Sequence, residues 1–259
     1  GGPRLLDKTV LPKERRSFAI PFAVLAPDFA GNVTVTLEQP GQPPVQRVIW
    51  LARVPERRSG RSAVDHKRRC LQVDGKPFFP IGWFSTYLSF GDVIAIDSLK
   101  EMARSGVNSV MLYSLMSDAK GERSFTDRGV TKTPGRILDA AAALGIKVQV
   151  YLLDITRPLS HGDLARMSEL EEVVRKWRNH PAVLCWYIAD DSAGPFLPTI
   201  YNRIKELDPH HVVTMAIAGS GDAYNVKYMH GVDAIMLETY PQGSDLPYSI
   251  MNVITRWPM

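Results

Sequence analysis

Cysteines and long apolar runs are scarce in this sequence. Only two cysteines, Cys70 and Cys185, occur among the 259 residues. Two cysteines outside any paired spacing exclude a zinc-ligand set or a disulfide framework, so we expect two free thiols. No stretch approaches the ~18–20 apolar residues that a membrane span requires, so no span is expected. The first residues, Gly1 to Arg4, lack the charged start and apolar middle of a signal peptide.

The positive charge is concentrated in one place. The net charge is +4, yet seven basic residues stand between Arg53 and Arg69, opposed only by Glu56 and Asp65. No aromatic residues are interleaved there for base stacking, which disfavours a nucleic-acid surface. The segment 53–70 is therefore interpreted as a basic linker or a surface strand pair, and no nucleic-acid partner is expected.

Residues 1–52 are predicted to be rich in β-strands. Three short apolar or alternating segments, 17–22, 33–37 and 45–50, indicate strands, and a Pro/Gly-rich turn occupies 39–44. A single sheet needs a partner to cover its apolar face. The segment is therefore either part of a β-sandwich or a small accessory sheet.

From residue 71 onward the pattern changes to alternating strands and helices. A hairpin is predicted over 71–78, with Asp74-Gly75 at its turn. Glycines just past two helical patterns, Gly106 and Gly145, are typical of helix C-caps. The predicted strands are 79–84, 109–113, 147–153, 183–189, 212–217 and 233–237; the predicted helices are 94–105, 133–144, 163–179, 197–207, 224–230 and 248–257.

This alternation predicts an α/β fold, a (β/α) TIM-type barrel over 71–259. Apolar, β-branched strands separated by helices indicate a parallel sheet covered by helices. The rival, a doubly wound open sheet, lacks its Gly-rich phosphate loop after the first strand. A closed barrel needs eight strands, and six are visible. We therefore expect either a C-terminally truncated barrel or closure by some other means.

Carboxylates and aromatic residues stand where these strands end. The reactive groups of a (β/α) barrel project from the C-terminal strand ends, and acidic groups beside flat rings suit a sugar. Alternative structural roles remain: Trp83 and Trp186 as core, Asp154 as a loop cap, and Tyr240 as part of a turn. The candidates are Trp83, Tyr113, Asp154, Trp186, Tyr187, Asp190, Asp191, Glu238 and Tyr240.

Three ordered segments resemble clan A glycoside hydrolases, the group that includes beta-galactosidase-like enzymes. Residues 71–82 look like the start of their barrel, often preceded by a domain of the β-sandwich type. Residues 186–191 are similar to the Trp-Tyr-x-x-Asp-Glu segment that ends strand four in many relatives. Residues 232–241 resemble their strand six. The resemblance covers residues 70–242.

The resemblance implies roles for particular carboxylates. The Glu of the strand-four segment is the general acid/base, and Asp191 stands at that position here. Its carboxyl group would lie on the order of 1 Å further from the glycosidic oxygen, a displacement that can cost ~100-fold. The nucleophilic Glu of the family ends strand seven. Within this chain the second carboxyl group would have to come from Glu238, Asp190 or Asp154.

Two functions follow. The first is hydrolysis of a glycosidic bond, with Asp191 as general acid/base and Asp190 orienting it or holding a sugar hydroxyl. The second is a catalytically inactive relative that binds a glycan or a protein partner. The sugar and its linkage are not specified by the sequence.

A less favoured third hypothesis is a metal-dependent barrel enzyme with His161, His211 or His230 among its metal ligands. None of these histidines stands in a recognisable ligand spacing. No metal or cofactor is expected. The family resemblance and the single sequon at Asn32 suggest an extracellular or secretory location.

Overall fold

The computed structural model describes residues 24–26, 29–53, 60–85, 91–113, 115–116, 123–125, 130–191, 194–218 and 231–238. The chain divides into two compact units, residues 1–57 and residues 58–259. Each unit is described by itself.

The first unit contains an antiparallel hairpin. Strands β1 (Ala30–Leu37) and β2 (Val45–Ala52) pair with Val33 opposite Ile49 and Leu37 opposite Val45. The connecting turn contains Gly41 at a φ of 75°, a conformation that glycine adopts without strain. Two of the three predicted strands are thereby confirmed. The third, 17–22, lies outside the described residues, and the β-sandwich stays a prediction.

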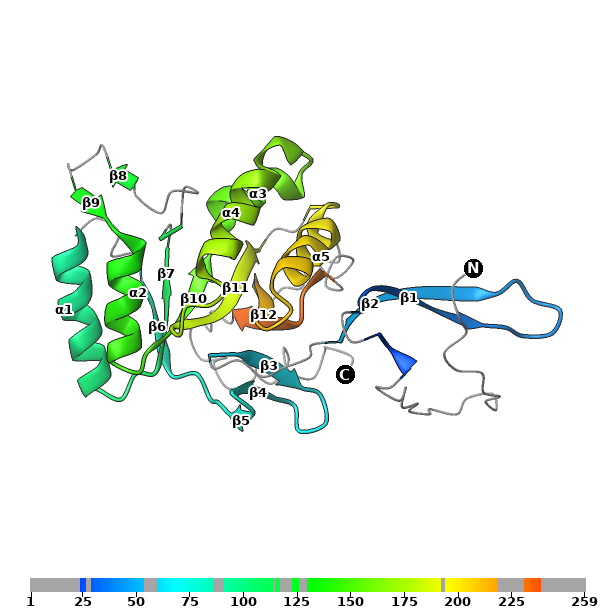
Figure 1. The fold of residues 1–259 in the computed structure, drawn as a ribbon, viewed down its shortest axis with the longest axis horizontal. Coiled ribbons are helices and arrows are strands. Elements are labelled where there is room, and N and C mark those ends of the chain that lie inside the picture. The colour runs from blue at the N-terminus through cyan, green and yellow to red at the C-terminus, as the bar shows by residue number, and fades with distance from the viewer. Residues whose placement is uncertain are drawn as a thin grey trace, which may run out of the picture. The chain divides into compact units, whose positions relative to one another are not determined.

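The second unit is built on a parallel six-stranded sheet (Figure 1). The spatial order of the strands follows the chain without reversal, whereas a doubly wound sheet reverses its order at a switch point. The predicted α/β fold of TIM-barrel type is therefore confirmed. The strands are β6 (Gly82–Ser85), β7 (Ser109–Leu112), β10 (Lys147–Tyr151), β11 (Val183–Asp190), β12 (Val212–Ala218) and β13 (Ala234–Glu238).

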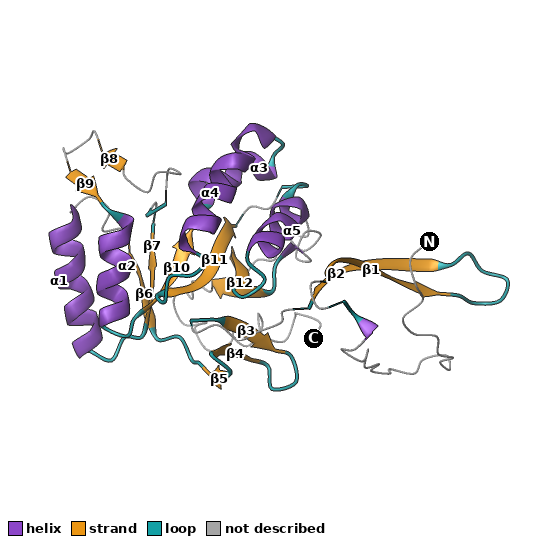
Figure 2. Cartoon of the chain, viewed as in Figure 1, coloured by secondary structure: helices purple, strands orange, loops and turns teal. Residues whose placement is uncertain are grey.

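Helices cover the outer face of this sheet (Figure 2). In α4 (Met167–Trp177), Leu170, Val173 and Val174 are buried, a spacing of three and four that forms one apolar stripe. That stripe joins the main hydrophobic core together with outward-facing strand residues such as Val150 and Val213. The other covering helices are α1 (Gly91–Arg104), α2 (Pro134–Ala143) and α5 (Leu197–Leu207).

Between β10 and α4 the structure differs from the sequence prediction. The strand predicted over 147–153 ends at Tyr151, and a short helix, α3 (Leu153–Ser160), follows at once. The buried Thr156 hydroxyl donates to the carbonyls of Leu152 and Ile188, which ties α3 to the end of β11. The helix predicted from 163 begins as a 3-10 turn, η3 (Leu164–Arg166), before α4.

Elsewhere one further element was not anticipated. A small hairpin, β8 (Arg123–Phe125) and β9 (Val130–Lys132), interrupts the connection between β7 and α2. The helices predicted over 224–230 and 248–257 lie outside the described residues.

A three-stranded antiparallel sheet packs at the N-terminal end of the parallel strands. It consists of β3 (Ser62–Asp65), β4 (Cys70–Val73) and β5 (Lys76–Pro77). Its apolar side chains contact the beginnings of β11 and β12. The predicted turn at Asp74-Gly75 is confirmed, with φ values of 51° and 76°. Part of the segment 53–70, predicted to be a basic linker or a surface strand pair, is strand β3, which pairs with β4 and packs against β11 and β12.

Candidate active site

The C-terminal ends of the parallel strands gather most of the candidate residues. Alternation along β11 sends Tyr187 toward the inner face of the sheet and Trp186 toward the helices. Tyr151 of β10 lies beside Tyr187 in the same inner cluster. Asp190 ends β11, and Asp191 follows it directly.

Four aromatic rings form a continuous row across neighbouring strands. The ring centroids of Phe84 and Tyr113 are 4.4 Å apart in an edge-on arrangement, and those of Tyr113 and Tyr151 are 4.5 Å apart. Tyr151 and Tyr187 continue the row at 5.9 Å. These separations are those of mutually stabilising aromatic pairs. The row therefore forms a fixed wall at the strand ends.

Asp190 is joined to this wall. The Tyr113 hydroxyl donates to Asp190 Oδ2 over 3.3 Å, connecting the end of β7 to the end of β11. Strand β10 lies between these two strands, so the bond passes over the end of β10. Asp190 thus has a defined position.

Asp191 is exposed and has an unusual backbone conformation. Its φ is 51°, in the left-handed region that aspartate tolerates better than most residues. Its backbone N–H donates to the carbonyl of Ala216 over 3.2 Å, which fixes the turn against β12. Consecutive residues in a regular strand alternate between faces, and this turn departs from that alternation directly after Asp190.

Asp154 lies in the first turn of α3, three residues beyond Tyr151. Its Oδ2 atom is buried and has no hydrogen-bond partner among the described residues. The backbone carbonyl of Asp154 accepts from Arg166, whose guanidinium also pairs with Glu169. The structure therefore contains a carboxylate oxygen at the strand ends whose acceptor capacity is unused.

Tyr151 was not singled out by the sequence analysis. Burial, reinforced by the charges of Asp154 and Asp190, raises the pKa of Tyr151 to about 12, and only Arg157 opposes this. The phenol therefore stays protonated at neutral pH and is able to donate a hydrogen bond. Continuing the inward alternation from Gln149 to Tyr151 would have identified it from sequence.

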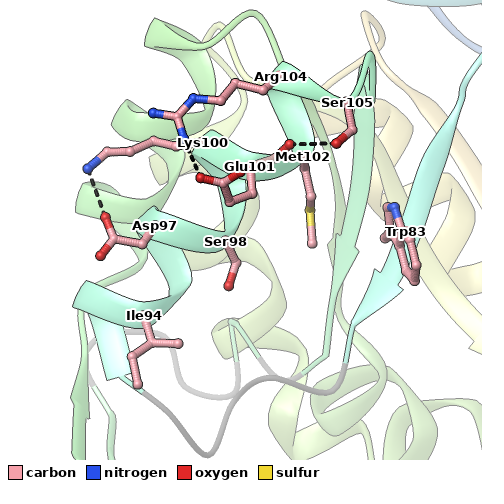
Figure 3. Close-up of a pocket in the computed structure, with 9 residues that line it drawn as sticks. All are labelled: Trp83, Ile94, Asp97, Ser98, Lys100, Glu101, Met102, Arg104 and Ser105. Atoms are coloured by element: carbon pink, nitrogen blue, oxygen red, sulfur yellow. Dashed lines mark hydrogen bonds and ion pairs between the residues drawn. The ribbon is translucent and has the colours of Figure 1, made fainter.

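The two tryptophans named as candidates lie on the other face of the sheet. Trp186 is fully buried, and its indole Nε1 donates to Asp208 Oδ2 over 2.7 Å. Trp83 is 61% exposed and lines a hollow of about 850 Å³ between β6 and α1 (Figure 3). The charged residues of α1 beside it form pairs along the helix, such as Lys100 with Asp97. None of the candidate carboxylates lines this hollow.

The remaining candidates are placed only in part. Glu238 ends β13, where its backbone pairs with Ala218, and its side chain lies outside the described part of the structure. Tyr240 and His230 also lie outside it. Cys70 and Cys185 are free thiols, and burial raises the pKa of Cys185.

Two further findings concern the described ranges of the chain. No group of three or more His, Cys, Asp or Glu side chains there could hold a metal ion. His211 instead contacts Asp208 and the carbonyl of Gly60, at the opposite end of the strands. No helix within these ranges has the length and apolar character for crossing a membrane.

The comparisons with known proteins agree with this geometry. Residues 155–257 match the family described as Glycosyl hydrolases family 2, TIM barrel domain. Human beta-glucuronidase is 32% identical over 110 residues, which is 40% of this chain and 16% of that protein. The chain therefore matches only about a sixth of the length of this curated relative.

Solved structures show the same fold. Beta-glucuronidase from Bacteroides uniformis matches with a TM-score of 0.53 and 14% identity, over 89% of this chain and 35% of that one. Beta-glucuronidase from Parabacteroides merdae matches with a TM-score of 0.52 and 14% identity, over 86% of this chain and 27% of that one. The resemblance predicted from the sequence is confirmed: the chain is similar to glycoside hydrolases and has the TIM-barrel fold of clan A.

Proposed function

We propose that this chain takes part in hydrolysis of a glycosidic bond, with Asp191 as the general acid/base. The observation that carries the proposal is the Asp190-Asp191 pair at the end of β11, beside a wall of aromatic rings. Barrel enzymes place their reactive groups at these strand ends. The exposure of Asp191 leaves its carboxyl group accessible to a substrate.

Asp190 has a supporting role in this proposal. The bond from Tyr113 holds one of its oxygens, so the carboxylate is positioned to accept from a sugar hydroxyl or to orient Asp191. Glycoside hydrolysis needs a second carboxyl group, ~5–5.5 Å away for retention and ~6.5–9.5 Å away for inversion. Glu238, Asp190 and Asp154 are the candidates within this chain.

The alternative is a catalytically inactive relative that binds a glycan or a protein at the same strand ends. The replacement of the family's Glu by Asp191 favours this alternative. The similarity to beta-glucuronidases makes β-glycosides, glucuronides included, the substrates to test first. An extracellular or secretory location remains part of the proposal.

The test compares three variants by release of 4-nitrophenol from β-linked glycosides. Asp191→Asn should lower kcat by about 10²–10⁴-fold, because the residue can no longer transfer a proton. Asp191→Glu should raise kcat about tenfold or more, because the added methylene restores the reach of the family's acid. Asp97→Asn, on the exposed surface of α1, is the matched control and should leave kcat unchanged.

The outcomes separate the two functions. Activity that survives Asp191→Asn would remove Asp191 from the mechanism. Sugar binding without turnover, in both the wild type and Asp191→Glu, would favour the inactive relative.

A further inference from the structure

The turn between β3 and β4 carries a cluster of positive charge. Residues 66–69 have the sequence His-Lys-Arg-Arg, and all four are exposed. Asp65 is the single acidic residue between positions 60 and 73. The β3–β4 hairpin lies at the N-terminal end of the parallel strands (Figure 1), the end opposite the candidate active site. We call residues 66–69 the basic turn.

Asp65 fixes the backbone of the basic turn. Its Oδ1 accepts from the backbone N–H groups of Lys67 and Arg68, over 3.0 and 2.9 Å. Its Oδ2 accepts from Gln72 Nε2 over 2.9 Å, which ties the turn to β4. Asp65 and Cys70 are paired residues of the two strands and close the turn at its base. A turn that is ordered before a ligand arrives loses less conformational entropy on binding.

The acidic and basic side chains of this hairpin differ in their exposure. The side chain of Arg68 is 71% exposed, whereas that of Asp65 is 17% exposed. Arg68 Nη1 lies 3.6 Å from Asp65 Oδ2, and an ion pair with so exposed a cation is weak. The carboxylate is directed to the turn backbone and Gln72, and the basic side chains lie at the surface. The hairpin therefore presents positive charge on three consecutive residues, 67–69.

Such a cluster suits a polymer that carries repeated anionic groups. A guanidinium group donates two parallel hydrogen bonds to a carboxylate or a phosphate, and sulfate has the same tetrahedral oxygens as phosphate. A nucleic acid is disfavoured, because no aromatic residue stands between positions 60 and 73 for bases to stack on. The similarity of the chain to glycoside hydrolases favours a carbohydrate polymer.

We propose that the basic turn is a binding surface for polyanionic polysaccharides, those that carry sulfate or carboxylate groups along the chain. Lys67 and Arg68 are its main contacts, because the bonds from their backbone N–H groups to Asp65 hold them in place. Binding at this turn leaves the C-terminal ends of the parallel strands accessible. The inference does not rest on the proposed hydrolysis, because it uses none of the candidate catalytic residues.

The test is binding of the full chain to fluorescein-labelled heparin, polygalacturonate and dextran, followed by fluorescence anisotropy across a salt titration. We expect heparin and polygalacturonate to bind with affinities that fall as salt rises, and neutral dextran not to bind. The double variant Lys67→Gln/Arg68→Gln should weaken heparin binding about tenfold or more at low salt. It should also reduce the slope of log affinity against log salt by about two, one for each lost charge. The variant keeps the backbone bonds to Asp65, so the turn stays folded.

The matched control is Lys100→Gln/Arg104→Gln on α1, which removes the same charge from side chains that are 49% and 70% exposed. It should change heparin affinity by less than about twofold. An equal loss in both double variants would show that net charge, and not the basic turn, attracts the polymer.

Three further outcomes decide the kind of partner. A wild-type chain that binds neither anionic polysaccharide at low salt would overturn the surface itself. Single-stranded DNA that binds more tightly than both polysaccharides would make the turn a nucleic-acid surface instead. Binding of either anionic polysaccharide that depends on Lys67 and Arg68 supports the proposal, and the ratio of the two affinities tells whether sulfate or carboxylate is preferred.

Discussion

Asp208 connects three parts of the second unit through one carboxylate. It follows α5 directly and is 1% exposed. Its Oδ2 accepts from the indole of Trp186 on β11 and lies 2.7 Å from His211 Nδ1. His211 Nε2 lies 3.0 Å from the carbonyl of Gly60, another acceptor. Asp208 therefore joins the end of α5 to β11, and through His211 to the chain at Gly60.

The contacts of Asp208 determine how the stability of the fold changes as the pH falls. Burial alone would raise the pKa of Asp208, but the hydrogen bond and charge of His211 and the bond from Trp186 outweigh it, so the pKa is lowered. A carboxylate whose pKa is lower in the folded state stabilises the fold above its unfolded pKa. That contribution is lost as the pH falls through the lower, folded-state value.

We therefore expect the stabilising effect of Asp208 to be present at pH 7 and to fade below about pH 4. Urea unfolding of wild type and Asp208→Asn at pH 7, 4 and 3 measures it. The difference in free energy of unfolding, about 3–5 kcal/mol at pH 7, should narrow at pH 3. The exposed Asp97→Asn should change stability little at any of these pH values. A difference between wild type and Asp208→Asn that is the same at pH 3 and pH 7 would contradict the prediction.

At the scale of elements, the packing of α3 helps to position the carboxylates at the C-terminal ends of the parallel strands. The helix begins two residues after β10 ends, and its last residue, Ser160, accepts through its carbonyl from the backbone of Phe196. Residues 194–196 therefore lie against the end of α3. Gly194 makes this possible, because a Cβ there would stand 1.8 Å from the Ser160 carbonyl oxygen.

Gly194→Ala should therefore push α3 and residues 194–196 apart. We expect a loss of about 2 kcal/mol or more in the free energy of unfolding, within the range for overpacking a buried contact. Chemical denaturation measures it. Gly31→Ala in β1 is the control, since its Cβ would meet only an ordinary contact at 3.9 Å. Equal stability of Gly194→Ala and wild type would show that the two segments can separate without cost.

At the scale of the whole second unit, a small sheet covers the N-terminal end of the barrel strands. The buried Ser62 hydroxyl of β3 donates to the carbonyl of Leu184 and accepts from the backbone N–H of Val212. One side chain thus serves neighbouring strands β11 and β12. The apolar side chains of Leu71, Val73 and Phe78 complete the contact.

Ser62→Ala should leave the Val212 N–H and the Leu184 carbonyl without this partner. Burying unsatisfied backbone groups costs about 1–3 kcal/mol, so the free energy of unfolding should fall by roughly that amount in a urea titration. Ser105→Ala on the exposed end of α1 removes a solvent-accessible hydroxyl bond and should cost much less. A loss no larger than that of Ser105→Ala would show that water replaces the Ser62 hydroxyl.

The sequence by itself determined the local elements of this protein. Alternation and helical spacing identified all six parallel strands and the four covering helices, because these patterns repeat over a few neighbouring residues. The same patterns placed Asp190 and Asp191 at a strand end. The hairpin turn at Asp74-Gly75 was equally readable, because positive φ at two successive residues strongly favours Asp-Gly.

Only the tertiary structure decided which side chains meet. It put Tyr187 rather than Trp186 on the inner face, added Tyr151 to the site and left a buried oxygen of Asp154 unpaired. It also formed β3 within the segment 53–70 and turned part of an expected strand into α3. Each of these outcomes depends on contacts with residues distant in sequence, such as Ser62 with Leu184 and Thr156 with Ile188. Local periodicity carries no information about such contacts, because the burial that stabilises them exists only once the elements have packed.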